Sequence, residues 1–157
     1  MGLFAKSGSE VKISAALLLL LLKDSQITLW DEGLGRSADS WASRCVWDHG
    51  PTRAMKYLGQ NMSITTGSST SEIVDLFSCQ MVWASSSRVG CAVRTCSDMQ
   101  AFGSSWNQAT LLVCNYSIKG NWVGQAPYKS GKPCSACPSS YGATCWRNQC
   151  SPNTRRL

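Results

Sequence analysis

The sequence contains a single histidine, which limits the chemistry that its side chains can perform. A zinc site needs three or four converging His, Cys or carboxylate ligands, and His49 cannot anchor one unless cysteines join it. A Gly-x-Ser-x-Gly motif is absent, and Asp48 is adjacent to His49 only in sequence. Glycosidase-type and phosphate-binding motifs are also absent. We therefore predict no catalytic residue, no metal site and no cofactor.

Acidic residues are scarce in the second half of the chain. Beyond residue 78, eight basic residues accompany Asp98 as the only acid, and the whole chain carries a net charge of +6. Such a surface suits an acidic protein, an anionic glycan or an anionic lipid surface, although it also simply keeps a protein soluble. There is no Lys/Arg-rich run with interleaved aromatic residues, so nucleic acid is not an expected partner.

Long hydrophobic runs are also lacking. The apolar run Ile13–Leu22 is too short to cross a bilayer, so no transmembrane segment is predicted. Its length, with Lys6 and Lys12 before it, suits a signal-peptide core, but the Lys23–Gln26 segment offers no small-x-small cleavage site. A buried helix end and an aberrant first-exon sequence are the alternatives. We treat residues 1–28 as a separate signal-like or aberrant segment.

Cysteine, in contrast, is abundant, with nine residues in a chain of 157. This density is typical of proteins in an oxidising, extracellular compartment. A hydrophobic content of 43% with 15% charged residues indicates one small globular domain with an appendage. We therefore predict a secreted protein.

The hydrophobic pattern predicts one helix and three strands. Apolar residues recur at helical spacing over Leu29–Cys45, and acidic residues near its start favour the N-terminal end of a helix. Strands are expected at Gln80–Ala84, Val89–Cys96 and Leu111–Cys114. The fold class is therefore α+β, with an antiparallel sheet covered on one face by the helix.

The segment CNYSIKGNWVGQAPY, which begins at the end of the last predicted strand, is rich in asparagine, glycine and aromatic residues. These residues suit a tightly packed loop with positive φ at Asn115, Gly120, Asn121 and Gly124. The segment closely resembles the C-terminal signature of the CAP superfamily (cysteine-rich secretory, antigen 5 and pathogenesis-related proteins; SCP domain). The matched positions are Cys114, Asn115, Tyr116, Gly120, Asn121, Trp122, Gly124, Pro127 and Tyr128.

Further blocks resemble the CAP subgroup related to peptidase inhibitor 15. They are Trp30–Pro51, Met55–Gly67, Gln80–Cys96 and Tyr128–Cys145, so the similarity runs from about Leu29 to Cys150. The resemblance implies a CAP-type α-β-α sandwich in residues 29–128, followed by a cysteine-rich, hinge-like tail in residues 129–157.

The resemblance also implies a cleft, usually formed by two histidines and two acidic residues. His49 matches the first histidine, and Gln60 occupies the position where many relatives carry the first glutamate. The motifs of the second acid and the second histidine are missing, because the chain passes from Ile73–Leu76 through Cys79 into Gln80 partway through the histidine motif. The domain is therefore expected to lack an internal block and to retain only a remnant of the cleft.

The positions of the cysteines suggest pairs in the predicted domain. Cys96 and Cys114 flank the last connection between neighbouring strands, so we expect them to pair, and Cys45 would then reach Cys91. Cys79 is left over by the odd count and is either a free or intermolecular thiol or simply a buried one.

The tail carries a C-x₂-C-x₇-C-x₄-C cluster with too few apolar residues to form a core. It resembles the hinge of cysteine-rich secretory proteins, which implies the pairs Cys134–Cys145 and Cys137–Cys150. A zinc ribbon with four cysteine ligands is the competing interpretation.

Two sequons are present, at Asn61 and Asn115. Asn61 is the candidate glycosylation site, because Asn115 belongs to the signature that we expect to be packed.

The function implied by the resemblance is that of a secreted, non-enzymatic protein. It would be a peptidase (serine protease) inhibitor or an extracellular protein-binding module. The alternatives are a lipid- or sterol-binding CAP protein and a truncated isoform with no activity of its own.

Overall fold

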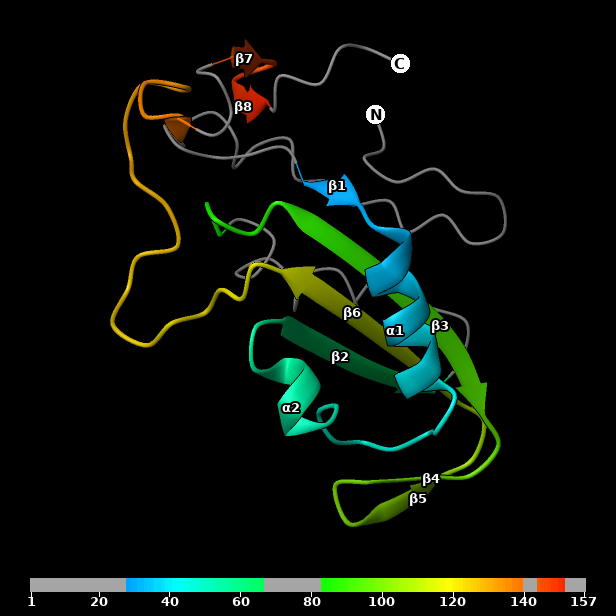
Figure 1. Ribbon diagram of the computed structural model, residues 1–157. Coiled ribbons are helices and arrows are strands. Elements are labelled where there is room, and N and C mark those ends of the chain that lie inside the picture. The colour runs from blue at the N-terminus through cyan, green and yellow to red at the C-terminus, as the bar shows by residue number, and fades with distance from the viewer. Residues whose placement is uncertain (1–27, 67–82, 140–143, 152–157) are drawn as a thin grey trace.

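The computed structural model describes residues 28–66, 83–139 and 144–151 (Figure 1). These residues form an α+β structure in which one long helix lies across a twisted sheet. The elements in chain order are β1 (Leu29–Trp30), α1 (Glu32–Ala42), α2 (Thr52–Met55), β2 (Gly59–Thr66), β3 (Arg88–Cys96), β4 (Met99–Ala101), β5 (Ser104–Trp106), β6 (Ala109–Ser117), β7 (Thr144–Trp146) and β8 (Gln149–Ser151).

Helix α1 confirms the predicted helix but is shorter than the pattern suggested. Asp31 is its N-cap, and the Asp31 Oδ1 atom accepts a hydrogen bond from the Leu34 backbone N–H at 3.0 Å. Leu34, Ala38 and Ala42 are buried, at the spacing of one helix face. The residues before Asp31 form strand β1, and Cys45 lies beyond the helix in a turn with a positive φ of 53°.

The main sheet has the strand order β1-β3-β6-β2. Strands β3 and β6 pair antiparallel along their whole lengths, β2 pairs antiparallel with β6, and β1 pairs parallel with β3. The predicted strands at Val89–Cys96 and Leu111–Cys114 are confirmed within β3 and β6. The prediction of a strand at Gln80–Ala84 is wrong for Trp83 and Ala84, which lie outside any strand, and residues 80–82 lie outside the described part.

Strand β2 was not among the predicted strands. Its sequence, GQNMSITT, is mostly polar, and β2 lies at the margin of the sheet next to β6. Along β2, Gln60, Met62 and Ile64 pair with Asn115, Val113 and Leu111, which lie on the face that α1 covers. A strand with one partner strand needs fewer apolar residues, so its pattern is weak.

Two clusters of buried residues lie on the two faces of the sheet, because successive side chains of a strand alternate between faces. The cluster beneath α1 consists of Ala38, Ala42, Cys96, Met99, Ala109, Leu111 and Val113. The cluster on the opposite face consists of Val89, Leu112, Cys114 and Tyr116. The sheet is therefore buried on both faces near its centre.

Gly90 allows α1 to approach the sheet closely. A Cβ atom at this position would lie 2.1 Å from the Gly35 backbone nitrogen and 2.5 Å from the Leu34 carbonyl carbon. Both atoms belong to the helix backbone, which cannot move aside as a flexible side chain could. Gly90 is thus the point at which β3 and α1 come into backbone contact.

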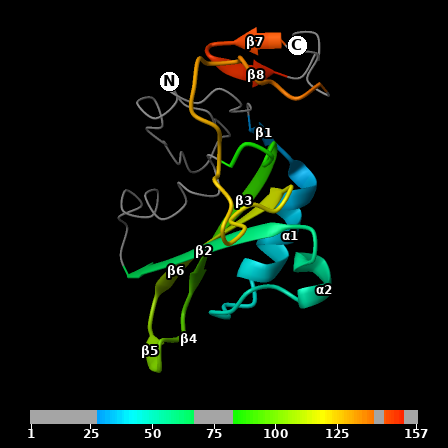
Figure 2. The same cartoon turned by 90° about the vertical axis from the view of Figure 1, so that its left-hand side faces the viewer.

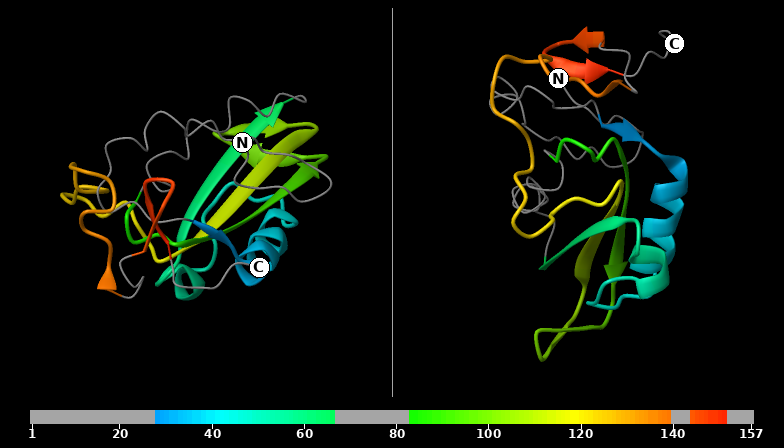
Figure 3. Two further views of the ribbon diagram at one scale, coloured as in Figure 1. Left: turned by 90° about the horizontal axis from the view of Figure 1, so that it is seen from above. Right: turned by 60° about the vertical axis from the view of Figure 1, so that its left-hand side comes forward.

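Two small hairpins extend the structure. The β4–β5 hairpin projects beyond one end of the main sheet (Figure 2), and the β7–β8 hairpin lies apart from the sheet after a long connection from β6 (Figure 3). Within the described ranges, no helix is long and apolar enough to cross a membrane. The predicted signal-like run and Cys79 lie outside the described residues.

Candidate functional site

The two residues that match the CAP cleft lie side by side. His49 is exposed in the loop after α1, and Gln60 is partly buried in β2. The His49 Nδ1 atom is 3.0 Å from Gln60 Oε1, which also accepts a hydrogen bond from the Gly50 backbone N–H at 2.9 Å. The sequence-predicted pair is therefore assembled by the fold.

A buried asparagine fixes the orientation of the Gln60 amide. Gln60 Nε2 donates to Asn115 Oδ1 at 3.0 Å, and Asn115 Nδ2 donates to Ser37 Oγ at 3.3 Å. Because the NH₂ group of Gln60 faces Asn115, its oxygen faces His49 and can only accept. The Nδ1 atom of a neutral His49 therefore carries the proton, and Nε2 is its acceptor atom.

This chain of hydrogen bonds, which we call the His49–Ser37 network, runs from the surface to the core. Asn115 is completely buried, yet both ends of its side-chain amide are satisfied. The network joins the loop after α1, strand β2, strand β6 and helix α1 itself. Gln60 cannot accept or release a proton as a glutamate would, so the group that contacts His49 Nδ1 in this network is not an acid. The Asp48 carboxylate accepts from the His49 backbone N–H instead.

Asn115 and Ser37 were not predicted as members of this site. We expected Asn115 in a loop with positive φ, which is wrong, because β6 continues to Ser117 and Asn115 lies within it. Asn115 pairs in register with Gln60 on one side and Gly90 on the other. Had the predicted strand been extended past Cys114, its alternation would have placed Asn115 on the helix-covered face.

The rest of the signature is more exposed than expected. Asn121 and Gly124 have the predicted positive φ values of 55° and 81°, whereas Gly120 is buried without one. Trp122 is half exposed, with its indole N–H donating to the Lys119 carbonyl oxygen at 3.1 Å. Val123 is fully exposed. The expectation of a loop packed throughout is therefore wrong around Trp122 and Val123.

Tyr116 is the aromatic residue of the signature that packs in the core. It is almost completely buried on the face opposite α1, and this burial raises the pKa of its hydroxyl group above the ordinary value. Asn61, the candidate glycosylation site, lies in the neighbouring strand β2 and is partly buried. Its glycosylation stays a prediction.

Two of the four disulfides in the described ranges correct our predicted pairing. Cys45 bonds to Cys96, and Cys91 bonds to Cys114. Cys91 and Cys114 are directly opposite each other on β3 and β6, with their Cα atoms 4.1 Å apart. Cys96 is on the face covered by α1, whereas Cys114 is on the other face, so these two could not meet.

The two disulfides of the tail are those that the resemblance implied. Cys134 bonds to Cys145, and Cys137 bonds to Cys150. The sulfur atoms of Cys134, Cys137 and Cys150, three of the four cysteines of the zinc-ribbon alternative, lie within 4.8 Å of one another. All three are already used in disulfides, and a thiolate is the form that binds zinc.

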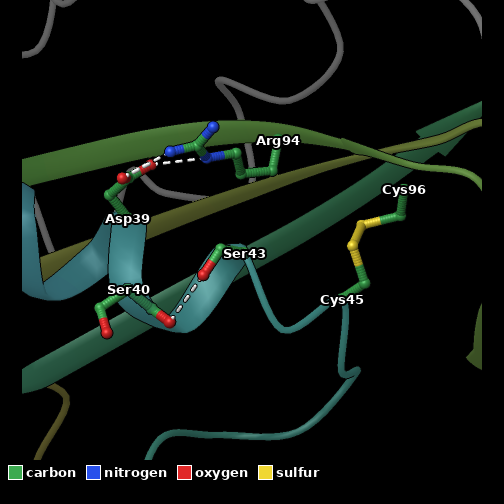
Figure 4. Close-up of a disulfide and its surroundings, with 6 residues drawn as sticks. All are labelled: Asp39, Ser40, Ser43, Cys45, Arg94 and Cys96. Atoms are coloured by element: carbon green, nitrogen blue, oxygen red, sulfur yellow. Dashed lines mark hydrogen bonds and ion pairs between the residues drawn. A yellow bond between two sulfur atoms is a disulfide. The ribbon is translucent and has the colours of Figure 1, made fainter.

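An ion pair joins α1 to β3, and a disulfide joins the loop after α1 to β3 (Figure 4). Arg94 donates through Nε to Asp39 Oδ1 at 2.7 Å and through Nη2 to Asp39 Oδ2 at 2.6 Å. These hydrogen bonds hold the pKa of the Asp39 carboxyl below its ordinary value and raise the pKa of Arg94. Both side chains are exposed to solvent, so we expect the pair to stabilise the fold only slightly.

The fold, the signature and the His49–Gln60 pair together define a CAP-superfamily protein, and the chain belongs to this family. The structure of BmVAL-1 matches with a TM-score of 0.62 at 20% identity, over 87% of this chain and 80% of that chain. Peptidase inhibitor R3HDML of Mus musculus is 48% identical over 155 residues, covering 78% of this chain and 61% of the relative. Peptidase inhibitor 15 of Gallus gallus is 45% identical over 156 residues, covering 79% of this chain and 60% of the relative. No family model matches the chain.

The chain spans about 60% of the length of these curated relatives. Only 78% of this chain takes part in an alignment 155 residues long, so R3HDML contributes residues there that have no counterpart in this chain. This agrees with an internal block missing from the domain. The junction that we inferred between Leu76 and Gln80 lies outside the described residues.

Proposed function

We propose that the chain is an extracellular CAP protein that binds a protein partner and catalyses no reaction. A serine protease is the partner class to test first. The curated relatives R3HDML and peptidase inhibitor 15 are both named as peptidase inhibitors, and the inhibitory role comes to this chain from that similarity.

The observation that carries the non-catalytic part of the proposal is the hydrogen bonding of Gln60. The Gln60 oxygen accepts hydrogen bonds from His49 Nδ1 and from the Gly50 backbone N–H, while the Gln60 NH₂ group donates a hydrogen bond to buried Asn115. A neutral amide thus occupies the position of an acid, and its known contacts are all within the protein. General acid–base catalysis at this position would need a group that exchanges protons.

The disulfides support the extracellular part. Eight of the nine cysteines are paired in four disulfides, two joining elements of the main sheet and its helix and two in the tail. Disulfides of this density persist in oxidising compartments and are rare in the cytosol. A protein stabilised in this way is suited to work outside the cell.

The test is a protease inhibition assay with the full chain purified in its oxidised form. We expect trypsin activity on a small chromogenic substrate to fall as the chain is added at concentrations near that of the enzyme. The same chain after reduction and alkylation is the control and should not inhibit. Unchanged activity of trypsin, chymotrypsin and elastase would contradict the inhibitory role.

The non-catalytic part has a separate readout. If the chain itself hydrolyses a peptide or ester substrate, and His49→Ala abolishes that hydrolysis, the proposal of a purely binding protein is wrong.

A further inference from the structure

The tip of the β7–β8 hairpin presents a tryptophan and an arginine as one exposed unit. The guanidinium carbon of Arg147 lies 4.4 Å from the centre of the Trp146 ring, and Trp146 is 52% exposed. Arg147 and Asn148 have positive φ values of 48° and 65° and form the two-residue turn between the strands. This is the type of turn that joins two antiparallel strands tightly.

The two tail disulfides hold this tip in place. Cys145 and Cys150 are directly opposite each other on the hairpin, one on each side of the turn. Each is bonded to a different upstream cysteine, Cys134 or Cys137. Both strands are therefore anchored, and a ligand that binds the tip has little backbone motion to restrict.

The charge of the tail has one sign. From residue 129 to the end there are five basic residues and no acidic residue. Lys132 lies two positions before Cys134, and Arg147 lies two positions after Cys145, so the Cys134–Cys145 disulfide brings their segments together with the two Cα atoms 5.6 Å apart. The tail thus carries no acidic side chain that would repel an anionic ligand from Arg147.

We propose that the Trp146–Arg147 tip is a binding site for a sulfated glycan. The exposed Trp146 ring offers a flat apolar face to a sugar ring, and the guanidinium of Arg147 offers paired N–H donors to a sulfate group. Lys132 adds positive charge to the segment that the Cys134–Cys145 disulfide joins to β7. This site is separate from the His49–Ser37 network, so it stands whether or not the chain inhibits a protease.

The neighbours of the tip favour a glycan over a lipid bilayer or an acidic peptide. Asn148, in the same turn as Arg147, is an exposed polar residue that can form hydrogen bonds with sugar hydroxyl groups. Membrane binding through a hairpin tip would need several exposed apolar side chains, and Trp146 is the only large one in this hairpin. An acidic peptide would use the charge of Arg147 but not the ring face of Trp146.

The experiment measures binding of the full oxidised chain to heparin by affinity chromatography and by titration. We expect Trp146→Ala and Arg147→Ala each to weaken binding about tenfold, and Arg147→Lys to weaken it less, because the charge remains but the planar donors are lost. The matched control is Lys56→Ala with Tyr57→Ala. That pair is also an exposed cation over an aromatic ring, at 5.2 Å, and its loss should change binding by less than about twofold.

Three results would overturn the proposal. The first is that both tip variants bind heparin as tightly as the wild type. The second is that the wild type binds chemically desulfated heparin as tightly as heparin. The third is that the wild type binds phosphatidylserine vesicles or polyglutamate as tightly as heparin, with the same dependence on Trp146 and Arg147. Trp146 is the last residue of β7 and Arg147 is in the turn, between Cys145 and Cys150, so disulfide mapping of each variant checks that its tail is intact.

Discussion

Asp31 is the residue at which helix α1 begins, and its carboxylate has two roles. It caps the helix through Leu34 and lies 3.1 Å from Arg88 in strand β3. The hydrogen bond from the Leu34 N–H is the largest cause that lowers the pKa of Asp31 below its ordinary value of 3.8. Its contribution to stability is therefore present above that value and is lost as the pH falls through the lower pKa of the folded state.

We predict that Asp31→Ala lowers the free energy of unfolding by about 1 kcal/mol at neutral pH. Asp31→Asn should retain most of the stabilisation from the helix cap, because asparagine is also a good N-cap residue. It should lose the part of that stabilisation that disappears when the Asp31 carboxylate is protonated in acid. Urea unfolding at neutral and acidic pH measures both effects. An Asp31→Ala loss that persists unchanged in acid would show that the carboxylate is not the cause.

Gly90 is the residue on which the distance between α1 and the sheet depends. Gly90→Ala should destabilise the fold by about 1–3 kcal/mol or prevent folding, since the new methyl group would meet helix backbone atoms. Gly103→Ala is the control, because no atom lies within 4 Å of the position of its Cβ and only its positive φ of 74° is unfavourable. Thermal unfolding compares the two, and equal losses would contradict the predicted contact.

Gln60 determines which nitrogen of His49 carries the proton. We predict that heteronuclear NMR of the full chain at alkaline pH shows protonated Nδ1 and unprotonated Nε2, which is readable because the protein has one histidine. Gln60→Ala should shift the signals towards a mixture of tautomers. Gln100→Ala, at an exposed position of β4, should leave them unchanged.

At the scale of the elements, a disulfide joins the loop after α1 to β3, and the Asp39–Arg94 ion pair joins α1 itself to β3. We predict that Cys45→Ser with Cys96→Ser lowers the free energy of unfolding by about 2–5 kcal/mol, whereas Asp39→Asn, which weakens the solvent-exposed pair with Arg94, lowers it far less. Chemical unfolding measures both. Similar losses would mean that the disulfide adds no constraint beyond that of the ion pair.

The elements that could be predicted are those whose local signals agree. Helix α1 has a capping residue and an apolar face of regular spacing, and β3 and β6 are apolar runs that pair along nine residues. Strand β2 could not be predicted, because its polar residues become buried only through pairing with β6. In the candidate site, the His49–Gln60 pair was predicted from the family resemblance. Asn115 and Ser37 could not be predicted, because they reach Gln60 only through the pairing of β6 with β2 and the packing of α1 on the sheet.

At the scale of the whole molecule, the α-β-α expectation is met as an incomplete sandwich. Helix α1 covers one face of the sheet, and the other helix in the described ranges, α2, has four residues. The opposite face still contains a buried cluster around Tyr116. The missing alignment positions relative to R3HDML agree with this reduced form.

The crossed arrangement of the tail disulfides has a consequence for proteolysis. If a trypsin-like enzyme cuts the peptide bond after Arg147, the segment from Asn148 onward stays attached, because Cys150 is still bonded to Cys137. We therefore predict that the nicked chain migrates as one band without reductant, gains only the mass of a water molecule, and releases a short C-terminal peptide once dithiothreitol is added. Cleavage at this turn would leave two polypeptide chains that remain joined by the Cys137–Cys150 disulfide.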